Sequence, residues 1–477
     1  MYLNDLIKGI EILEKEGEGN PEITGVHYNS ATVKKGGLFV AIEGFKTDGH
    51  KYIADAVKRG AAAIICSKLT PDTDAVQIRV ADCRKAEAKV SAEFFGNPSR
   101  RFKLIGVTGT NGKTTVTHLV KHILDHCGYT TGLIGTNYNM IADKVLETGR
   151  TTPDSFELQK LFSDMADAGV DYTIMEVSSH ALCLSRVYGC EFEVGAFTNL
   201  TQDHLDFHVT MDEYAKAKAM LFDISKNAVI NADDIYGKKM AEVCPCPCRL
   251  YGRDDADFGA RDVVLNQNGV EFSLGGERFT LNIPGDFSVY NALCAIGICH
   301  SLGISYGDIR RALATACGVK GRAEVVDTGS TDYTVMIDYA HTPDGIETIL
   351  NTVRGFAKGR VVIVFGCGGD RDNTKRPIMG SVAGSLADLC IVTSDNPRTE
   401  NPRAIIDMVV EGVKKTAENY VVIEERYDAI KYALENALPG DVIVLAGKGH
   451  ETYQILNTGT IHFDEREVVR GILGLEE

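Results

Sequence analysis

Short runs of apolar residues alternate along the chain with longer segments whose apolar positions recur at helical spacing. The clearest run, Lys103–Thr108, is followed by a glycine-containing turn and a helical pattern from Thr114 to about Cys127. Short apolar runs bounded by turn residues are typical of buried strands. Similar runs, with helical patterns between them, occur at 172–177, 194–198, 228–230, 334–338, 361–365, 389–393 and 442–446. This alternation predicts an α/β fold with mainly parallel sheets.

Changes in the pattern divide the chain into three predicted domains. Residues 1–98 hold short apolar runs such as Gly37–Ile42, and Phe95–Arg101 has the Gly, Asn and Pro typical of a linker. The second domain, 99–324, opens on the strand before the glycine-containing turn. The third, 325–477, has its own strands and helical patterns and is predicted to be a second α/β unit.

The composition is that of a globular protein. Hydrophobic residues make up 44% of the 477 positions and charged residues 24%, so a large core can form. A net charge of −16 disfavours nonspecific binding to nucleic acid or to an anionic membrane. The chain shows neither a signal-peptide pattern nor an apolar run of the roughly 18 residues that span a bilayer. We therefore expect a cytoplasmic protein without nucleic-acid or membrane partners.

The 13 cysteines are odd in number and mostly scattered, which indicates reduced thiols in a chain without an export signal. One cluster, Cys244, Cys246 and Cys248, alternates with prolines. Alternating thiols suit a soft metal, but no second cluster of Cys or His at zinc spacing accompanies them. The pattern favours a short strand edged by prolines.

The turn after the first buried strand has the residues of a phosphate-binding loop. Gly109 and Gly112 allow a tight turn that points backbone N–H groups at phosphates, and the following helix adds its dipole. Lys113 can neutralise phosphate charge, and Thr114 can place a hydroxyl on Mg²⁺. The common pattern G-x-x-x-x-G-K-[ST] needs a glycine at Val107, so the loop is a shortened variant. A functionless turn is disfavoured by Lys-Thr-Thr at the helix start.

Polar residues also follow two later strands. Glu176 ends one strand, and Asp203, His204, Asp206 and His208 come after the next. Ligands collect at the carboxyl ends of parallel strands, so the four crowded residues favour a metal or phosphate site. Glu176 alone is equally compatible with an exposed surface position.

One lysine lies on the apolar side of a helical pattern. Helical spacing places Lys218 on the same face as Tyr214 and Phe222, whereas Lys216 points elsewhere. On periodicity alone, the favoured interpretation is a lysine whose amine snorkels past its neighbours to water.

Several motifs together resemble those of the Mur ligases, which build the peptide of the bacterial cell wall. The resemblance covers essentially the whole chain, and within the family it is strongest to the ligases that add the third residue. Its motifs are Gly109–Thr115, Glu176–His180, Asp203–Asp206, Tyr290-Asn291, Gly321–Glu324, Asp338–Pro343 and Gly447–Glu451.

The resemblance implies an ATP- and Mg²⁺-dependent amide ligase of peptidoglycan precursor synthesis that acts as a monomer on small molecules. ATP phosphorylates the terminal carboxylate of UDP-N-acetylmuramoyl-L-alanyl-D-glutamate, and the amine of the incoming amino acid then attacks the acyl phosphate. The implied fold has a UDP-binding N-terminal α/β domain, a central P-loop-like ATPase domain with a parallel sheet, and a C-terminal Rossmann-like domain that binds the amino acid.

The resemblance also implies roles for individual residues. Lys218 carries a carbamate that helps to hold Mg²⁺ with Thr114, Glu176 and His204, and the catalytic residues are Lys113, Lys218 and His204. The implied ATP-binding residues are Gly109, Thr110, Asn111, Gly112, Lys113, Thr114, Thr115, Asn291, Arg322, Asp338 and His341. Those for the UDP-muramoyl-peptide are Tyr28, Ser30, Phe45, Lys46, Thr47, Thr151, Thr152, Ser178 and Arg186. Leu184 stands where some relatives have Gln, which leaves one substrate hydrogen bond open.

The incoming amino acid is predicted from Asp395–Arg398, which follows a strand. Taken alone, Asn-Pro-Arg is a turn. Within the resemblance it is typical of ligases that add meso-diaminopimelate, whose second carboxylate suits the planar fork of Arg398. The implied contacts are Arg371 for a carboxylate, Glu451 for an ammonium, and Asp395, Asn396, Pro397, Arg398 and Gly447.

Three alternatives differ in testable features. A lysine-adding ligase of the same family has no use for Arg398. A folylpolyglutamate synthase shares the loop and the central domain but not an N-terminal domain of the kind in residues 1–98. A nucleotide-binding regulator without ligase activity could keep Gly109–Thr115 while losing Lys218, Glu176 and Arg398, all of which are present. The segment Gly366–Asp372 does not complete a dinucleotide-binding G-x-G-x-x-G pattern.

Overall fold

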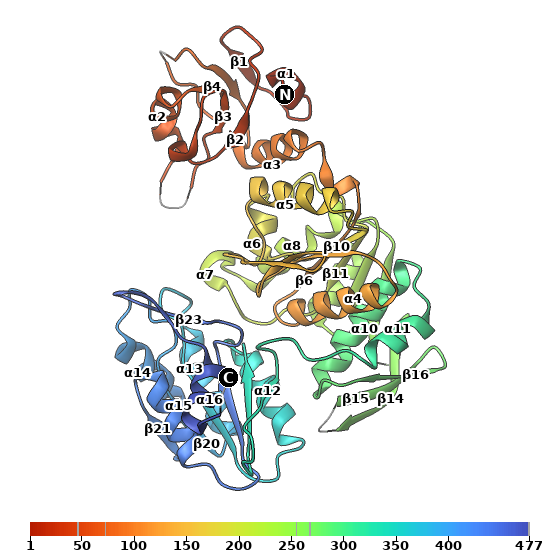
Figure 1. The fold of residues 1–477 in the computed structure, drawn as a ribbon, viewed down its shortest axis with the longest axis vertical. Helices are drawn as coiled ribbons and strands as arrows, with labels where there is room; N and C mark the ends of the chain where they lie inside the picture. Colours follow the sequence, from red (N-terminus) through yellow and green to blue (C-terminus); the bar gives the residue numbers. More distant parts are fainter. Residues whose placement is uncertain (45–46, 72, 254, 267–268, 476–477) are drawn as a thin grey trace.

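Three sheets, each built on buried apolar strands, organise the chain (Figure 1). The computed structural model describes residues 1–477 except 45–46, 72, 254, 267–268 and 476–477. The units built on the three sheets follow one another along the long axis of the molecule, from red through green to blue. The predicted α/β class is confirmed. The domain boundaries at 98 and 324 stay predictions, and the third sheet begins with β17 at Glu324.

The first sheet has the order β1-β5-β4-β3-β2, with β1 antiparallel and the other strands parallel. Its strands are β1 (Glu14–Glu16), β2 (Gly25–His27), β3 (Gly37–Val40), β4 (Ala61–Cys66) and β5 (Val76–Arg79). Its helices are α1 (Leu3–Leu6), α2 (Ile53–Lys58) and α3 (Cys83–Phe94). Side chains of β3 and β4 alternate between two apolar clusters, so both faces of the sheet are buried.

The second sheet has the order β16-β15-β14-β13-β12-β11-β6-β10-β7-β8-β9. Its parallel centre is β6 (Lys103–Thr108), β7 (Thr131–Ile134), β10 (Tyr172–Glu176), β11 (Val194–Phe197), β12 (Ala228–Asn231) and β13 (Cys248–Arg253). Antiparallel hairpins extend both edges, through β8 (Asn139–Ile141) and β9 (Lys144–Leu146), and through β14 (Phe258–Asn266), β15 (Gly269–Leu274) and β16 (Glu277–Leu281). The strand–helix alternation did not predict these hairpins.

Helices on both faces of the second sheet bury its centre. They are α4 (Lys113–His126), α5 (Ser155–Asp167), α6 (Ser179–Cys183), α7 (Leu205–His208), α8 (Met211–Ala219), α9 (Ile235–Glu242), α10 (Asp286–Ser301) and α11 (Tyr306–Leu313). Helix α10 has small and apolar residues all round, as expected of a helix that packs on every side. It shares one apolar core with α4 and the sheet, and this packing fixes the start of α4 relative to the strand ends.

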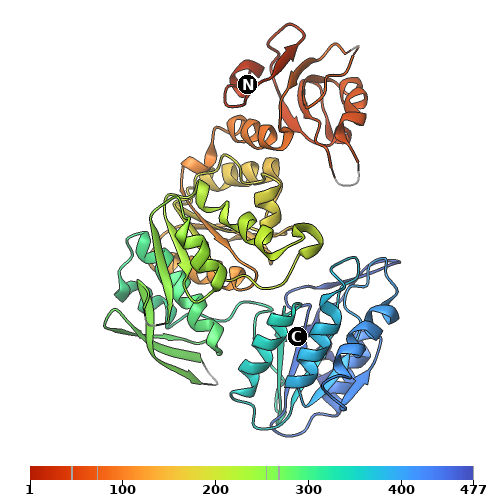
Figure 2. The same ribbon diagram turned by 180° about the vertical axis from the view of Figure 1, so that it is seen from behind.

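The third sheet has the order β17-β18-β22-β19-β20-β21, and only β17 runs antiparallel to its neighbour. Its strands are β17 (Glu324–Val326), β18 (Thr334–Asp338), β19 (Val361–Phe365), β20 (Leu389–Val392), β21 (Tyr420–Val422) and β22 (Val442–Ala446). Helices α12 (Pro343–Arg354), α13 (Lys375–Leu386) and α14 (Pro402–Val413) cover one face (Figure 2). The other face packs on α15 (Arg426–Glu435) and α16 (Glu465–Leu473), and a hairpin of β23 (Tyr453–Leu456) and β24 (Gly459–His462) precedes α16.

The cysteine cluster differs from its predicted structure. Cys244 and Cys246 lie in the loop between α9 and β13, and only Cys248 begins a strand, so the predicted short strand is wrong for 244–247. Pro247 accepts a backbone hydrogen bond from Ala228 but has no N–H to donate in return, which delays pairing by one residue. The thiols of Cys244 and Cys246 are 3.7 Å apart, and all 13 cysteines are free.

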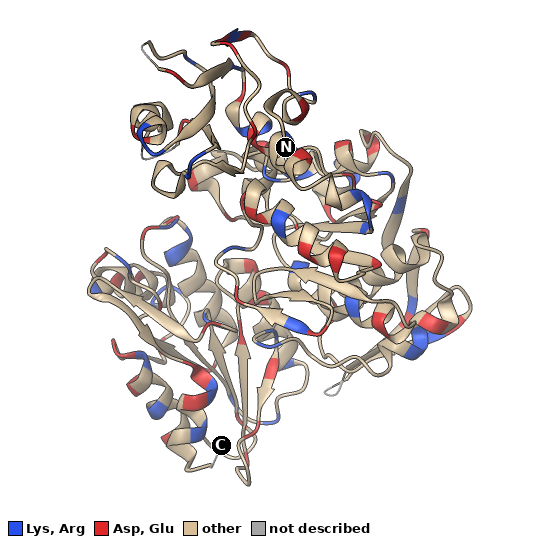
Figure 3. Cartoon of the chain, turned by 45° about the horizontal axis from the view of Figure 1, so that its top comes forward, with Lys and Arg blue, Asp and Glu red and all other residues tan. Residues whose placement is uncertain are grey.

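Positively and negatively charged residues occur along all three units (Figure 3). Among the described residues, no helix has the length and apolar character that crossing a membrane requires.

A buried ion pair attaches the last helix to the third sheet. The side chains of Arg426 and Glu465 are both 0% exposed and lie 2.7 Å apart, and Arg426 also donates to the Ala446 carbonyl at 2.8 Å. Removing one partner of such a pair leaves an uncompensated buried charge. We predict that Glu465→Ala lowers the free energy of unfolding of the third unit by about 3–5 kcal/mol, measured by urea unfolding and amide exchange in α15 and α16. Glu467→Ala, which removes an exposed carboxylate from the same helix, is the matched control; equal unfolding of the two variants would contradict the prediction.

Candidate active site

The phosphate loop joins the end of β6 to the start of α4. Gly109 and Gly112 have φ of 148° and 84°, which favour glycine. A Cβ on Gly109 would lie 1.8 Å from the Thr198 hydroxyl oxygen, so the loop packs directly on the end of β11. The backbone there is therefore possible only with glycine.

Two lysines converge on one carbonyl of this loop. The Nζ of Lys113 donates to the carbonyl oxygens of Gly109 at 2.9 Å and Thr110 at 2.8 Å, and the Nζ of Lys218 donates to Gly109 at 2.7 Å. Burial lowers the pKa of both amines, and the charge of Lys113 lowers that of Lys218 further. An anion at this loop would therefore meet two amine groups and several backbone N–H groups.

Lys218 does not snorkel to water. Its residue is 1% exposed, and its Nζ lies 4.4 Å from the ring centroid of Tyr214. Tyr214 and Phe222 are buried on the same side, as the helical spacing predicted. The interpretation of a solvent-directed lysine is wrong because α8 packs beneath the loop, and spacing fixes the face of a helix but not the depth of its burial.

Glu176 is not a surface residue. It is 1% exposed, and its two oxygens accept from the Thr114 hydroxyl at 3.0 Å and from the N–H and hydroxyl of Thr136 at 2.8 and 3.1 Å. Arg322 donates to the same Thr114 hydroxyl at 3.1 Å. Oxygen atoms of Thr114 and Glu176 thus meet beside the loop. Thr136, which follows β7, is a member of this group that the sequence motifs did not indicate.

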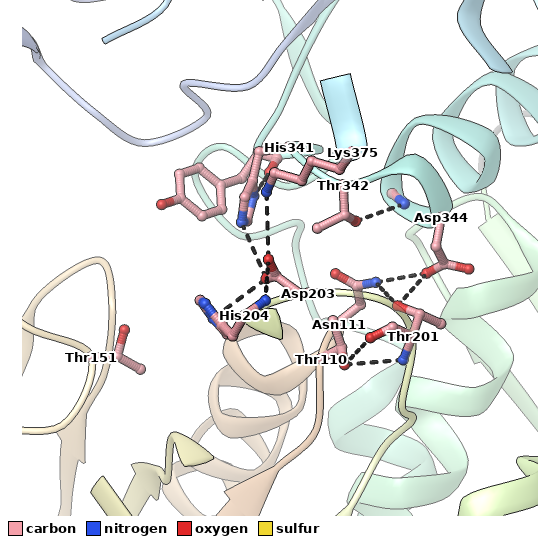
Figure 4. Close-up of polar contacts among 12 residues, drawn as sticks. Thr110, Asn111, Thr151, Thr201, Asp203, His204, His341, Thr342, Asp344 and Lys375 are labelled. Atoms are coloured by element: carbon pink, nitrogen blue, oxygen red, sulfur yellow. Dashed lines mark hydrogen bonds and ion pairs between the residues drawn. The ribbon is translucent and has the colours of Figure 1, made fainter. Parts of the chain in front are cut away.

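The polar residues that were predicted to lie together after β11 separate into two groups. Asp203 is buried and lies within 3.4 Å of both His204 and Lys375 and 3.9 Å from His341 (Figure 4). Burial alone would raise the pKa of Asp203, but the neighbouring His204 and Lys375 hold it well below its usual value. His208 instead turns to the hydroxyl of Ser179, 2.8 Å away. Asp206 is exposed.

Burial lowers the pKa of His204 to about 3, so its ring is neutral at physiological pH and can offer a nitrogen lone pair. Among the described residues, no three His, Cys, Asp or Glu side chains are grouped to hold a metal by themselves. The predicted metal set combines Glu176 and His204 with a threonine and a lysine. The oxygens of Thr114 and Glu176 suit Mg²⁺, which prefers oxygen ligands, whereas the Lys218 amine does not unless it is modified.

One cavity of about 370 Å³ lies between the second and third sheets. Predicted ATP-binding residues line it, namely Asn111, Gly112, Thr115, Asn291, Arg322 and Asp338. The Arg322 guanidinium lies 4.7 Å from the ring centroid of Tyr339, and Asp338 accepts from the Ala323 N–H at 2.7 Å. The aromatic walls come from Tyr251, Phe287, Tyr290 and Tyr339, four residues that were not predicted to bind the nucleotide.

An adjoining cavity of about 330 Å³ brings three groups of predicted residues together. The residues predicted to bind the phosphates are Thr110, Lys113, Thr114 and His341. Those predicted to bind the peptide, called here the peptide group, are Thr151 and Ser178. Those predicted to bind the amino acid, the amino-acid group, are Arg371, Asp395, Asn396, Arg398, Gly447 and Glu451. Glu176 and His204 line it as well. Residues more than 300 positions apart in the chain thus face one space.

The amino-acid group is held by its own hydrogen bonds. Arg398 has a left-handed φ of 52° and donates to the Gly369 carbonyl at 2.7 Å. Asn396 and Lys448 both donate to the Glu451 carboxylate at 2.9 Å, and burial raises the pKa of Glu451. The buried Oδ2 of Asp395 has no hydrogen-bond partner among the described residues. Pro397 packs its carbonyl against Gly369 and does not line the cavity.

Thr152 and Arg186, also predicted to bind the peptide, do not line the cavity but form hydrogen bonds beside it. Thr152 donates to the Glu176 carbonyl at 2.8 Å, and Arg186 donates to the Thr152 carbonyl at 2.9 Å. The Thr151 and Thr136 hydroxyls are 3.0 Å apart.

Tyr28, Ser30 and Thr47, predicted to bind the UDP-muramoyl-peptide, lie in the first unit and line neither cavity. The Tyr28 hydroxyl donates to Glu157 at 2.6 Å, Thr47 lies 3.2 Å from the Tyr52 hydroxyl, and Ser30 is buried. Phe45 and Lys46 lie outside the described residues.

Family models match all three units. The model of the Mur ligase family catalytic domain matches residues 22–96, the Mur ligase middle domain 107–299, and the Mur ligase glutamate ligase domain 321–449. The chain therefore belongs to the Mur ligase family. A UDP-N-acetylmuramoyl-L-alanyl-D-glutamate--2,6-diaminopimelate ligase of Clostridium botulinum is 51% identical over 99% of both chains. The ligase of the same name from Caldanaerobacter subterraneus subsp. tengcongensis is 50% identical over the full length of both.

Solved structures agree with this assignment. A UDP-N-acetylmuramoyl-L-alanyl-D-glutamate--2,6-diaminopimelate ligase superposes with a TM-score of 0.68 at 30% identity and covers 98% of both chains. A Mycobacterium tuberculosis folylpolyglutamate synthase has a TM-score of 0.64 at 18% identity, covering 82% of this chain and 96% of its own. At that identity it shares the fold alone.

The close packing of Gly109 generates a test of the loop. We predict that Gly109→Ala weakens binding of a non-hydrolysable ATP analogue by at least about 100-fold, or about 2.7 kcal/mol, because the new methyl would displace Thr198 and the loop. Isothermal titration calorimetry measures the affinity. Gly128→Ala is the control, since Gly128 also has positive φ (85°) but open space around its Cβ position. Equal affinities in the two variants would show that the Gly109 contact is unimportant.

Proposed function

We propose that this chain is the ATP-dependent ligase that joins meso-diaminopimelate to UDP-N-acetylmuramoyl-L-alanyl-D-glutamate in peptidoglycan precursor synthesis. The observation that carries the proposal is the single cavity lined by the phosphate loop, by Thr151 and Ser178, and by Arg398 and Glu451. A reaction that couples a phosphoryl donor, a carboxylate and an amine needs these three groups within reach of one another. The names of the full-length relatives support the same reaction.

The loop side of the cavity suits transfer of a phosphoryl group to a carboxylate. Two anions must approach each other, and Lys113 with the loop N–H groups would offset their repulsion. Mg²⁺, held by Thr114, Glu176 and His204, would supply further neutralisation of phosphate charge. A Thermotoga maritima ligase of the same fold has been solved with ADP, which is consistent with nucleotide binding in this family.

The opposite side of the cavity suits the second half-reaction. The amine attacks the carbonyl carbon of the acyl phosphate, the C–O bond to phosphate breaks, and the amine loses a proton as the amide forms. Arg398 and Glu451 would orient the amino acid through a carboxylate and an ammonium group, so the reacting amine faces the acyl carbon. The substrates are small molecules, and we propose that the enzyme acts on them in the cytoplasm as a monomer.

The lysine-adding alternative is disfavoured by the position of Arg398. Its guanidinium lines the cavity and donates to the backbone carbonyls of Gly369 at 2.7 Å and Asn396 at 3.4 Å, and among the described residues it forms no ion pair. A second substrate carboxylate would neutralise this charge, and lysine has none. The folylpolyglutamate synthase alternative is disfavoured by residues 22–96, which match the Mur ligase model of the first unit.

The position of Arg398 predicts amino-acid selectivity. In an amino-acid-dependent phosphate-release assay, we expect meso-diaminopimelate to exceed L-lysine in kcat/KM by at least about 100-fold, because the lysine complex leaves the guanidinium unpaired. Arg398→Ala should remove most of that preference, whereas Arg403→Ala, which breaks only an exposed pair with Asp407, should retain it. Turnover of L-lysine as efficient as that of meso-diaminopimelate would contradict the assignment.

We further propose that Lys218 carries a carbamate. Its lowered pKa favours the neutral amine, which can attack CO₂ to form an N–C bond with release of one proton. The product is an anion placed beside Lys113 and near the predicted Mg²⁺ ligands, and its oxygen atoms would suit Mg²⁺ where an amine nitrogen would not.

The carbamate role predicts a rescue experiment. Lys218→Ala should lower kcat by at least about 100-fold, the loss typical of removing one electrostatic group from an active site, and formate or acetate should restore part of it. Lys216→Ala, an exposed position two residues away on the same helix, should keep full activity. Full activity in Lys218→Ala, or loss without any rescue by small carboxylates, would contradict the carbamate.

A further inference from the structure

A side chain of the third unit reaches across to the phosphate loop. Asp344, in the first turn of α12, accepts a hydrogen bond from the side-chain amide of Asn111 at 2.7 Å (Figure 4). The hydroxyl of Thr201 donates to the same carboxylate oxygen at 3.4 Å. Asn111 lies within the loop, and Thr201 lies in the segment after β11, so both donors belong to the second unit.

The backbone of Asn111 is held entirely by the second unit. Its N–H donates to the side-chain oxygen of Asn199 at 2.9 Å. Its carbonyl accepts from the Thr198 hydroxyl at 2.6 Å and from the Asn199 amide at 3.2 Å. The side chain is therefore the part of Asn111 whose position depends on α12.

Thr201 extends the same network towards Lys218. Its N–H donates to the Thr110 hydroxyl at 3.1 Å, and that hydroxyl lies 3.3 Å from the Tyr214 hydroxyl. The ring of Tyr214 lies 4.4 Å from the Lys218 amine. A displacement of Asp344 would thus disturb the hydrogen bonds of two consecutive loop residues, Thr110 and Asn111. Through Tyr214 it would also affect the helix that carries Lys218.

The carboxylate of Asp344 is suited to this contact. It sits at the N-terminus of α12, where the helix dipole favours a negative charge, and the Thr342 hydroxyl caps the same turn by accepting from the Gly345 N–H at 3.1 Å. Burial raises the pKa of Asp344, and the hydrogen bonds from Asn111 and Thr201 act in the opposite direction. Hydrogen bonds to a carboxylate are stronger than those between neutral groups, so the contact is worth more than a neutral pair would be.

We propose that Asp344 is a positioning residue for the nucleotide: it fixes Asn111, and with it the phosphate loop, when the third unit lies against the second. This inference rests on the proposed function, because it assigns the loop to ATP. Since the hydrogen bond crosses between the second and third units, ATP binding and the contact between these units should stabilise each other. Asp344 itself lines the cavity of about 370 Å³, but the role assigned to it here acts through Asn111.

The test compares three variants at two positions of α12. We expect Asp344→Ala to raise both the KM for ATP and the Kd of a non-hydrolysable ATP analogue by about tenfold, which corresponds to about 1.4 kcal/mol. The KM for meso-diaminopimelate should change less than about twofold. Asp344→Asn keeps an acceptor oxygen for Asn111 and should recover most of the affinity. Glu347→Ala removes an exposed carboxylate from the next turn of the same helix and should behave as the wild type.

A double-mutant cycle then separates positioning from direct contact. If Asp344 acts through Asn111, then Asp344→Ala adds no further loss of affinity to Asn111→Ala. The proposal is overturned if Asp344→Ala binds the analogue as the wild type does, or if the two losses multiply. Because analogue binding needs no acceptor amino acid, the cycle remains readable if the wild type binds ATP but forms no amide, in which case the proposed function fails and not this inference.

Discussion

The carbonyl oxygen of Gly109 accepts hydrogen bonds from two lysines, and the active site is organised around that convergence. Lys113 reaches it from the start of α4, and Lys218 reaches it from α8 beneath the loop. Burial lowers the pKa of both amines, and the charge of Lys113 lowers the pKa of Lys218 further. A bound polyphosphate would favour the charged form of Lys113, whereas the neutral amine of Lys218 is the form that the proposed carbamate requires.

The fold supplies the geometry around this point. The loop, Glu176 and the segment after β11 all lie at the carboxyl ends of parallel strands of the second sheet, where ligands bind in open α/β folds. The third sheet brings Asp395–Arg398 and Gly447–Glu451 to the same space from its own strand ends. The first unit is joined to the second by contacts such as Tyr28 with Glu157. The groups that would react therefore lie between the units, and catalysis depends on how the units are arranged.

Much of the centre of the fold could be predicted from the sequence, for a physical reason. Strands such as β6 and β22 are buried on both faces and read as continuous apolar runs, and a Gly-Lys-Thr turn at the start of a helix has few other uses. The strands β14–β16 mix buried positions with exposed or half-buried ones and carry no such run, so the sequence did not predict them. Thr136 and Asp344 could not be found either, because each gains its role only from a partner far away in the chain.

Lys218 shows what the spacing of residues in the sequence can predict and what it cannot. Periodicity placed it on the apolar face, but only the packing of α8 under the loop shows that the amine ends on the Gly109 carbonyl. Likewise, Asn-Pro-Arg is a turn in isolation, and Arg398 became informative once it lined the same cavity as Lys113.

The most direct test of the central claim follows the transfer of an oxygen atom from the substrate carboxylate to the released phosphate. If the cavity joins a phosphoryl donor, a carboxylate and an amine as described, the terminal carboxylate of the UDP-muramoyl-dipeptide passes through an acyl phosphate. With that carboxylate labelled with ¹⁸O, the phosphate released during amide formation should carry one ¹⁸O atom per turnover, as read by mass spectrometry or by the ³¹P isotope shift. Release of unlabelled phosphate alongside amide product would contradict the account.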